Sequence, residues 1–73
     1  MEMKMKIEIY RTHALPNGLV VDEKPETTIT NISSFEIHGS YLFYTYADKK
    51  YENEHFTLHL DECNYKYIIK LEE

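Results

Sequence analysis

Apolar and polar side chains alternate strictly over two segments of this chain. Residues 3–10 (MKMKIEIY) place four apolar side chains on one face of an extended backbone, those of Met3, Met5, Ile7 and Ile9. Residues 54–61 (EHFTLHLD) do the same with Phe56, Leu58 and Leu60. A period of two residues is typical of a strand with one buried face and does not fit a helix. Both segments therefore predict half-buried β-strands.

Turn residues and β-branched residues predict the remaining strands. The turn LPNG at residues 15–18 favours a hairpin that returns through a short strand over residues 19–21. Gly39-Ser40 predicts a tight turn between two strands. The further strands are expected over residues 27–38, 41–47 and 65–71.

One of these segments does not alternate regularly. The apolar residues Ile29 and Ile32 are three positions apart, where a regular strand would place them two or four apart. This spacing predicts a bulge or kink near Asn31. Altogether we expect an all-β, single-domain meander over residues 1–73, with about five to six short strands curled into a barrel or a two-layer sandwich.

Charge and cysteine usage narrow the class of protein. Thirteen acidic and eight basic residues give a net charge of −5, which opposes nonspecific binding to nucleic acid because that requires clustered cations. Cys63 is the single cysteine, and with no secretory signal in the N-terminal residues we expect a cytoplasmic protein. Since no run approaches about 20 apolar residues, we expect no membrane span.

The segment YLFYTY, residues 41–46, places bulky side chains on both faces of one strand. Tyr41, Phe43 and Thr45 share one face, and Leu42, Tyr44 and Tyr46 share the other. We expect Phe43 inside and the second set outward, because tyrosines are enriched in protein interfaces. The predicted binding residues are Tyr41, Leu42, Tyr44, Tyr46, Tyr51, His55 and His59.

Other candidate chemistry is weak. His55, His59, Asp61 and Cys63 would share one face of a strand, but a tetrahedral zinc site needs ligands from converging segments. Acidic neighbours disfavour the thiolate of Cys63. We therefore expect no enzyme activity, no cofactor and no metal.

These observations favour a small acidic protein-binding module that acts on a host or self protein through a tyrosine-rich sheet face. A phage or mobile element could encode such a chain as a stoichiometric inhibitor of a host protein. Two alternatives stay open. One is a homo-oligomer that binds a small nucleotide between protomers, and the other is a structural subunit of a larger assembly.

Overall fold

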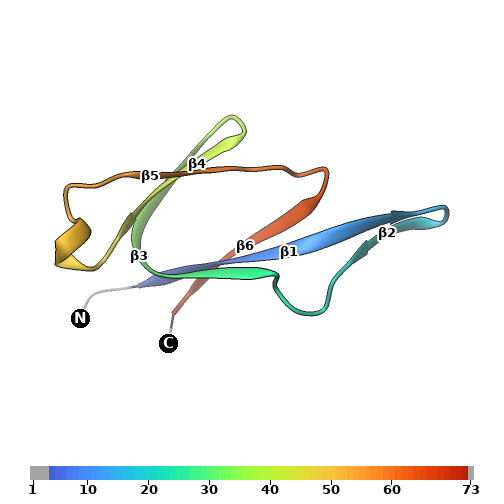
Figure 1. Ribbon diagram of the computed structural model, residues 1–73, viewed down its shortest axis with the longest axis horizontal. Coiled ribbons are helices and arrows are strands. Elements are labelled where there is room, and N and C mark those ends of the chain that lie inside the picture. The colour runs from blue at the N-terminus through green and yellow to red at the C-terminus, as the bar shows by residue number, and fades with distance from the viewer. Residues whose placement is uncertain (1–3, 73) are drawn as a thin grey trace.

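Six antiparallel β-strands form the described part of the chain, shown in Figure 1. The computed structural model describes residues 4–72. The elements are β1 (Met5–Leu15), β2 (Gly18–Val21), β3 (Thr27–His38), β4 (Tyr41–Tyr46), the 3-10 helix η1 (Lys49–Tyr51), β5 (Phe56–His59) and β6 (Tyr65–Leu71). The described residues contain no α-helix, so the all-β prediction is confirmed. Met3, predicted on the buried face of the first strand, lies outside the described residues.

Strand β1 has neighbours along both of its edges. Residues 5–11 pair with β6 on one edge. On the other edge, residues 5–9 pair with the first half of β3, and residues 12–15 pair with β2. The loop between β2 and β3 follows this same edge, because the N–H of Glu26 donates to the C=O of Ile9 at 2.8 Å.

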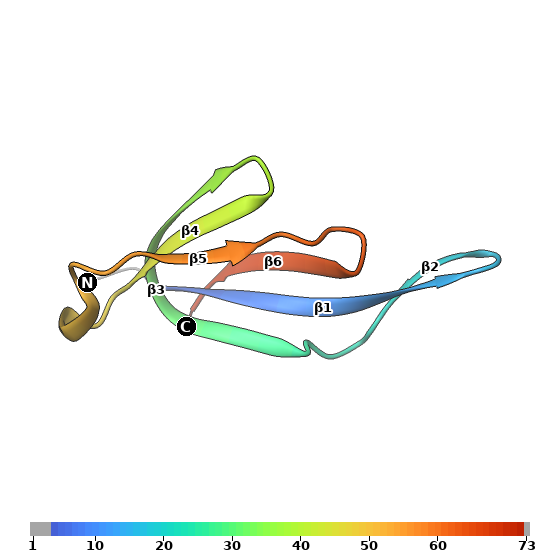
Figure 2. The ribbon, with the colours of Figure 1, turned by 45° about the horizontal axis from the view of Figure 1, so that its top comes forward.

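A kink in β3 turns the sheet over on itself. Asn31 has a φ of +63°, in the left-handed region that non-glycine residues rarely adopt. The pairing register with β1 shifts between Ile29 and Ile32, and the register with β4 shifts between Ile32 and Ser34. Its N–H donates to a carboxylate oxygen of Glu72 at 3.0 Å, and its C=O accepts from the N–H of Ala47 at 2.8 Å. Beyond the kink β3 leaves β1 and pairs with β4, so that β4 and β5 lie over β1 and β6 (Figure 2). The kink predicted near Asn31 is confirmed.

The sheet does not close into a barrel. Its strand order is β2-β1-β3-β4-β5, with β6 on the remaining edge of β1, and β5 and β6 form no ladder with each other. Because β6 returns to β1, the topology also departs from a simple meander. A side chain bridges the opening: the hydroxyl of Tyr67 donates to the C=O of His59 at 3.3 Å and accepts from the N–H of Asp61 at 3.1 Å.

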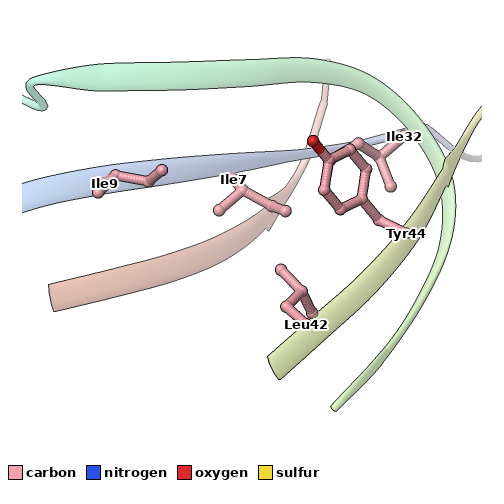
Figure 3. Packing of buried hydrophobic residues seen from close by; sticks show 5 residues of the cluster. All are labelled: Ile7, Ile9, Ile32, Leu42 and Tyr44. Atoms are coloured by element: carbon pink, nitrogen blue, oxygen red, sulfur yellow. The ribbon is translucent and has the colours of Figure 1, made fainter. Parts of the chain in front are cut away.

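The core is small and lies between the two halves of the folded sheet, as Figure 3 shows. Its buried apolar residues are Ile7, Ile9, Ile32, Leu42 and Tyr44. Partly buried side chains pack around them, among them Phe56, Leu58 and Leu60. The inward faces predicted for residues 5–9 and 54–61 are therefore confirmed.

The orientation predicted for the strand YLFYTY is wrong. Leu42 is 1% exposed and Tyr44 9% exposed, whereas Phe43 is 39% exposed. The cause is the register of the hairpin that joins β4 to β5. It places Leu42 opposite Leu58 and Tyr44 opposite Phe56, and residues opposite each other project to the same face of a sheet. Since Leu58 and Phe56 point inward, Leu42 and Tyr44 do as well.

Candidate binding surfaces

The structure separates the seven predicted binding residues into three groups. Leu42 and Tyr44 belong to the core, and neither side chain lies on the outer face of the sheet. Tyr46 and Tyr51 are half-buried at one end of the sheet. The exposed residues of the set lie on the outer face of β4 and β5 and in the loop before β5, and they are Tyr41, His55 and His59.

The half-buried tyrosines close the end of the core. The ring of Tyr46 packs edge-on against Phe56 at 4.9 Å between centroids, and the ring of Tyr51 lies 5.9 Å from that of Phe56. Tyr44 stacks on Phe56 from the inner side at 5.8 Å. Burial raises the pKa of the Tyr44 phenol, with a smaller contribution from Tyr46. Because these rings bury one another, this aromatic cluster belongs to the packed core of the fold.

The outer face of β3, β4 and β5 combines aromatic rings with histidines. Tyr41 lies opposite both His38 and His59, with its ring 5.1 Å from that of His59. Phe43 packs edge-on against His38 at 5.6 Å, and the His38 ring lies 3.0 Å from a carboxylate oxygen of Glu36. A shallow depression of about 250 Å³ lies beside them and reaches His55. Sequence reasoning identified Tyr41, His55 and His59 here but missed Phe43 and His38.

A larger cleft opens on the inner side of the folded sheet. Its volume is about 490 Å³, within the range of roughly 300–1,000 Å³ that is usual for ligand sites. Segments from every part of the chain line it: Thr12, Leu19, Val21, Ile37, Leu42, Leu60, Glu62, Tyr65, Lys66, Tyr67 and Ile69. Most of these side chains are aliphatic or aromatic. We call this site the apolar cleft.

The apolar cleft exists because the sheet is open. Beyond the kink, β3 diverges from β1, so Ile37 has no strand over it and remains 54% exposed. The opposite wall is formed by β2, where Leu19 is 62% exposed. The bridge from Tyr67 to the end of β5 holds the third wall in place. Sequence reasoning missed this cleft because its lining depends on which strands leave their neighbours.

Residues 12–21 form a second unusual feature, which we call the arm. Here the only ladder is that between β1 and β2, and the ribbon projects past the rest of the sheet (Figure 1). At its base the N–H of Thr12 also donates to the C=O of Asn64 at 2.9 Å. Three of its apolar residues are exposed, namely Leu15, Leu19 and Val20. The arm contains no Asp, Glu, Lys or Arg. The sequence shows that this segment carries no such charges, but only the structure shows that it projects from the sheet.

The described residues contain no group of three or more His, Cys, Asp and Glu side chains that could hold a metal ion. Cys63 is an exposed free thiol. Among residues 4–72 there is also no helix with the length and apolar character needed to cross a membrane.

The chain matches no protein-family model, and neither curated proteins nor solved structures show a significant match to it.

Proposed function

We propose that this chain is a small acidic protein-binding module whose binding site is the apolar cleft. It acts stoichiometrically in the cytoplasm, by occupying a surface of its partner. The exposed free thiol of Cys63 supports a reducing compartment. The site proposed on the inner side replaces the tyrosine face expected from the sequence, because that face turns Leu42 and Tyr44 into the core.

The observation that supports this function is the imbalance between buried and exposed apolar side chains. Among the described residues, eight large apolar or aromatic side chains are exposed, whereas five apolar residues are buried. A chain of this size has a small core and is marginally stable, so apolar side chains left in water reduce a stability that is already low. Such an exposed apolar surface marks a contact site. Covering a half-exposed Leu or Ile contributes on the order of 1 kcal/mol.

The arrangement of the cleft resembles the centre of a protein interface. Ile37 and Leu19 offer apolar walls, and the exposed charges of Glu62 and Lys66 lie among the lining residues. Apolar centres with polar margins are the usual organisation of such interfaces, and a few anchoring side chains supply most of the affinity. We therefore expect the partner to insert an aliphatic or aromatic side chain into the cleft.

A small apolar or aromatic molecule is the second candidate occupant, favoured by the cleft volume of about 490 Å³. A nucleotide fits this chemistry less well. Its phosphates need cationic partners, and among the described lining residues the charges of Lys66 and Glu62 offset each other.

Affinity capture with two matched variants tests the protein-binding function. Ile37→Lys places a charge in the cleft at an already exposed position, so the fold should survive. Thr57→Lys adds the same charge at an exposed position of β5 outside the cleft lining. The native chain and Thr57→Lys should retain the same partner from a lysate of the source cell. Ile37→Lys should bind that partner about tenfold or more weakly by calorimetry.

Two results would contradict the proposal. Equal affinity of the native chain and Ile37→Lys for the captured partner would remove the cleft from the interface. Failure to capture any partner, together with a thermal shift caused by small aromatic compounds and abolished by Ile37→Lys, would instead support the second candidate.

A further inference from the structure

The arm exposes the free edge of β2 as well as its side chains. The N–H of Asp22 donates to the C=O of Arg11 at 3.0 Å, which fixes the alternation of the β1–β2 ladder. Backbone groups of Val20 therefore point toward β1, and those of Leu19 and Val21 point away from it. The free edge of β2 thus presents two N–H and two C=O groups in a row.

This edge lacks the devices with which proteins usually protect exposed strands. Charged side chains, a proline or a bulge normally block pairing with another chain. The sequence of β2 is GLVV, without a charge or a proline, and its ladder with β1 is regular from residue 18 to residue 21. An isolated two-stranded ribbon is also marginally stable in water, so the arm would gain from a third strand.

The accessible surface area of the molecule also indicates that part of its surface is covered by a partner. The accessible surface is 5679 Å² for a chain of 8.8 kDa, whereas a compact monomer of that mass exposes about 4,800 Å². The radius of gyration is 13.9 Å, compared with about 11 Å for a compact chain of this length. The excess area is close to the roughly 800 Å² that each partner buries in a standard interface.

We propose that the arm is a dimerisation element and that its occupant is the β2 strand of a second copy of this chain. The two strands pair antiparallel about a two-fold axis at Val20, so that Leu19 of one protomer exchanges hydrogen bonds with Val21 of the other. A four-stranded ribbon results, and the exposed Leu15 and Val20 side chains of both copies gather on one face of it.

Charge permits this register despite the net charge of −5. With Val20 on the axis, Asp22 of one copy lies opposite Gly18 of the other, and Glu23 lies opposite Asn17. No acidic residue of the arm or its adjoining loop meets an acidic residue of the second copy in this register. The apolar clefts of both copies open on the same side of the ribbon, so the dimer remains compatible with partner binding.

Sedimentation equilibrium of the native chain provides the first test. The expected mass is twice the chain mass of 8.8 kDa at micromolar concentration. Val20→Lys sets two like charges opposite each other on the axis and should weaken the dimer roughly tenfold or more. Thr57→Lys is the matched control and should remain dimeric. A monomeric native chain, or a dimer that Val20→Lys leaves intact, would overturn the proposal.

Cysteine cross-linking tests the register independently, in chains that also carry Cys63→Ser. Directly opposed residues in this ladder have Cα atoms about 4.5 Å apart, within the range of a disulfide. Val20→Cys should therefore oxidise to a covalent dimer. Leu19→Cys should not, because in this register its two copies are separated along the strands beyond about 7 Å. Equal cross-linking of both variants, or cross-linking of Leu19→Cys alone, would overturn the register.

Amide hydrogen exchange of the native chain completes the test without a substitution. Dilution to the monomer should speed exchange at Leu19 and Val21 while leaving Val20 unchanged. The cleft variant Ile37→Lys should dimerise normally, so failure of the dimer and failure of the proposed partner site are separate results.

Discussion

The hydroxyl of Tyr67 on β6 donates a hydrogen bond to the C=O of His59 at the end of β5, at 3.3 Å. The same hydroxyl accepts from the N–H of Asp61 at 3.1 Å. These are the backbone groups that a closing strand would use if β5 and β6 paired. One phenol therefore satisfies two backbone groups at the edge of β5, and the sheet stays open.

Removing this hydroxyl should loosen the junction between β5 and β6. We expect Tyr67→Phe to lower the free energy of unfolding by about 1–2 kcal/mol, because two hydrogen bonds are lost and two backbone groups must find water. Tyr65→Phe removes a hydroxyl outside this bridge and is the control. Urea denaturation measures both, and equal stability of the two variants would show that the bridge contributes nothing.

Truncation along β4 should reveal its inward face. Leu42→Ala should cost about 2–5 kcal/mol of stability because the side chain is buried among core residues. Phe43→Ala should cost about 1 kcal/mol or less, since its ring lies on the outer face. Chemical denaturation of both variants gives the comparison. A larger loss for Phe43→Ala would mean that the strand faces the opposite way.

The left-handed backbone at Asn31 should tolerate glycine but not a β-branched residue. Asn31→Val should destabilise the fold by about 1–3 kcal/mol, because an L-residue with a branched Cβ is strained at positive φ. Asn31→Gly should be close to neutral. Thr30→Val, at the preceding position with ordinary strand geometry, is the control for valine itself. Thermal unfolding should rank the three variants, and equal losses for both valine variants would contradict the strain.

Acid should remove the contribution of the Glu8–Lys70 ion pair to the stability of the fold. A hydrogen bond from Lys70 at 2.7 Å lowers the pKa of Glu8 and raises that of Lys70. Because the folded pKa of Glu8 lies below its ordinary value of 4.5, the pair stabilises the fold above that pH. The contribution is lost as the pH falls through the lowered value, and at the alkaline end as the pH rises through the raised pKa of Lys70.

Glu8→Gln tests this dependence. The variant should be less stable than the native chain at neutral pH, and the two melting temperatures should converge as the pH falls through the lowered pKa of Glu8. Glu54→Gln, at an exposed carboxylate in the loop before β5, is the control and should leave the native profile unchanged. A constant difference between native and Glu8→Gln across the acid range would exclude the pair as the cause.

Most of the strand pattern could be predicted from the sequence, because strict alternation and turn residues are local signals. Ile7 and Ile9 lie inward as their period of two requires, and the spacing of Ile29 and Ile32 announced the kink at Asn31. The candidate binding sites were harder to predict from the sequence. Tyr41 was identified as a binding residue although its face of the strand was expected to be buried, and the exposed cleft that Ile37 lines was missed.

What the sequence determined by itself was where strands form and, where one face is polar, which face is buried. It left β4 undecided, because Leu42 and Phe43 make its two faces equally apolar and a local pattern cannot rank them. Only the pairing of Leu42 with Leu58 and Ile37 chose the inner face. The cleft and the arm likewise arise from tertiary structure. Each exists where a strand continues after its neighbour has turned away, and that divergence is set by the kink at Asn31 and the end of β6.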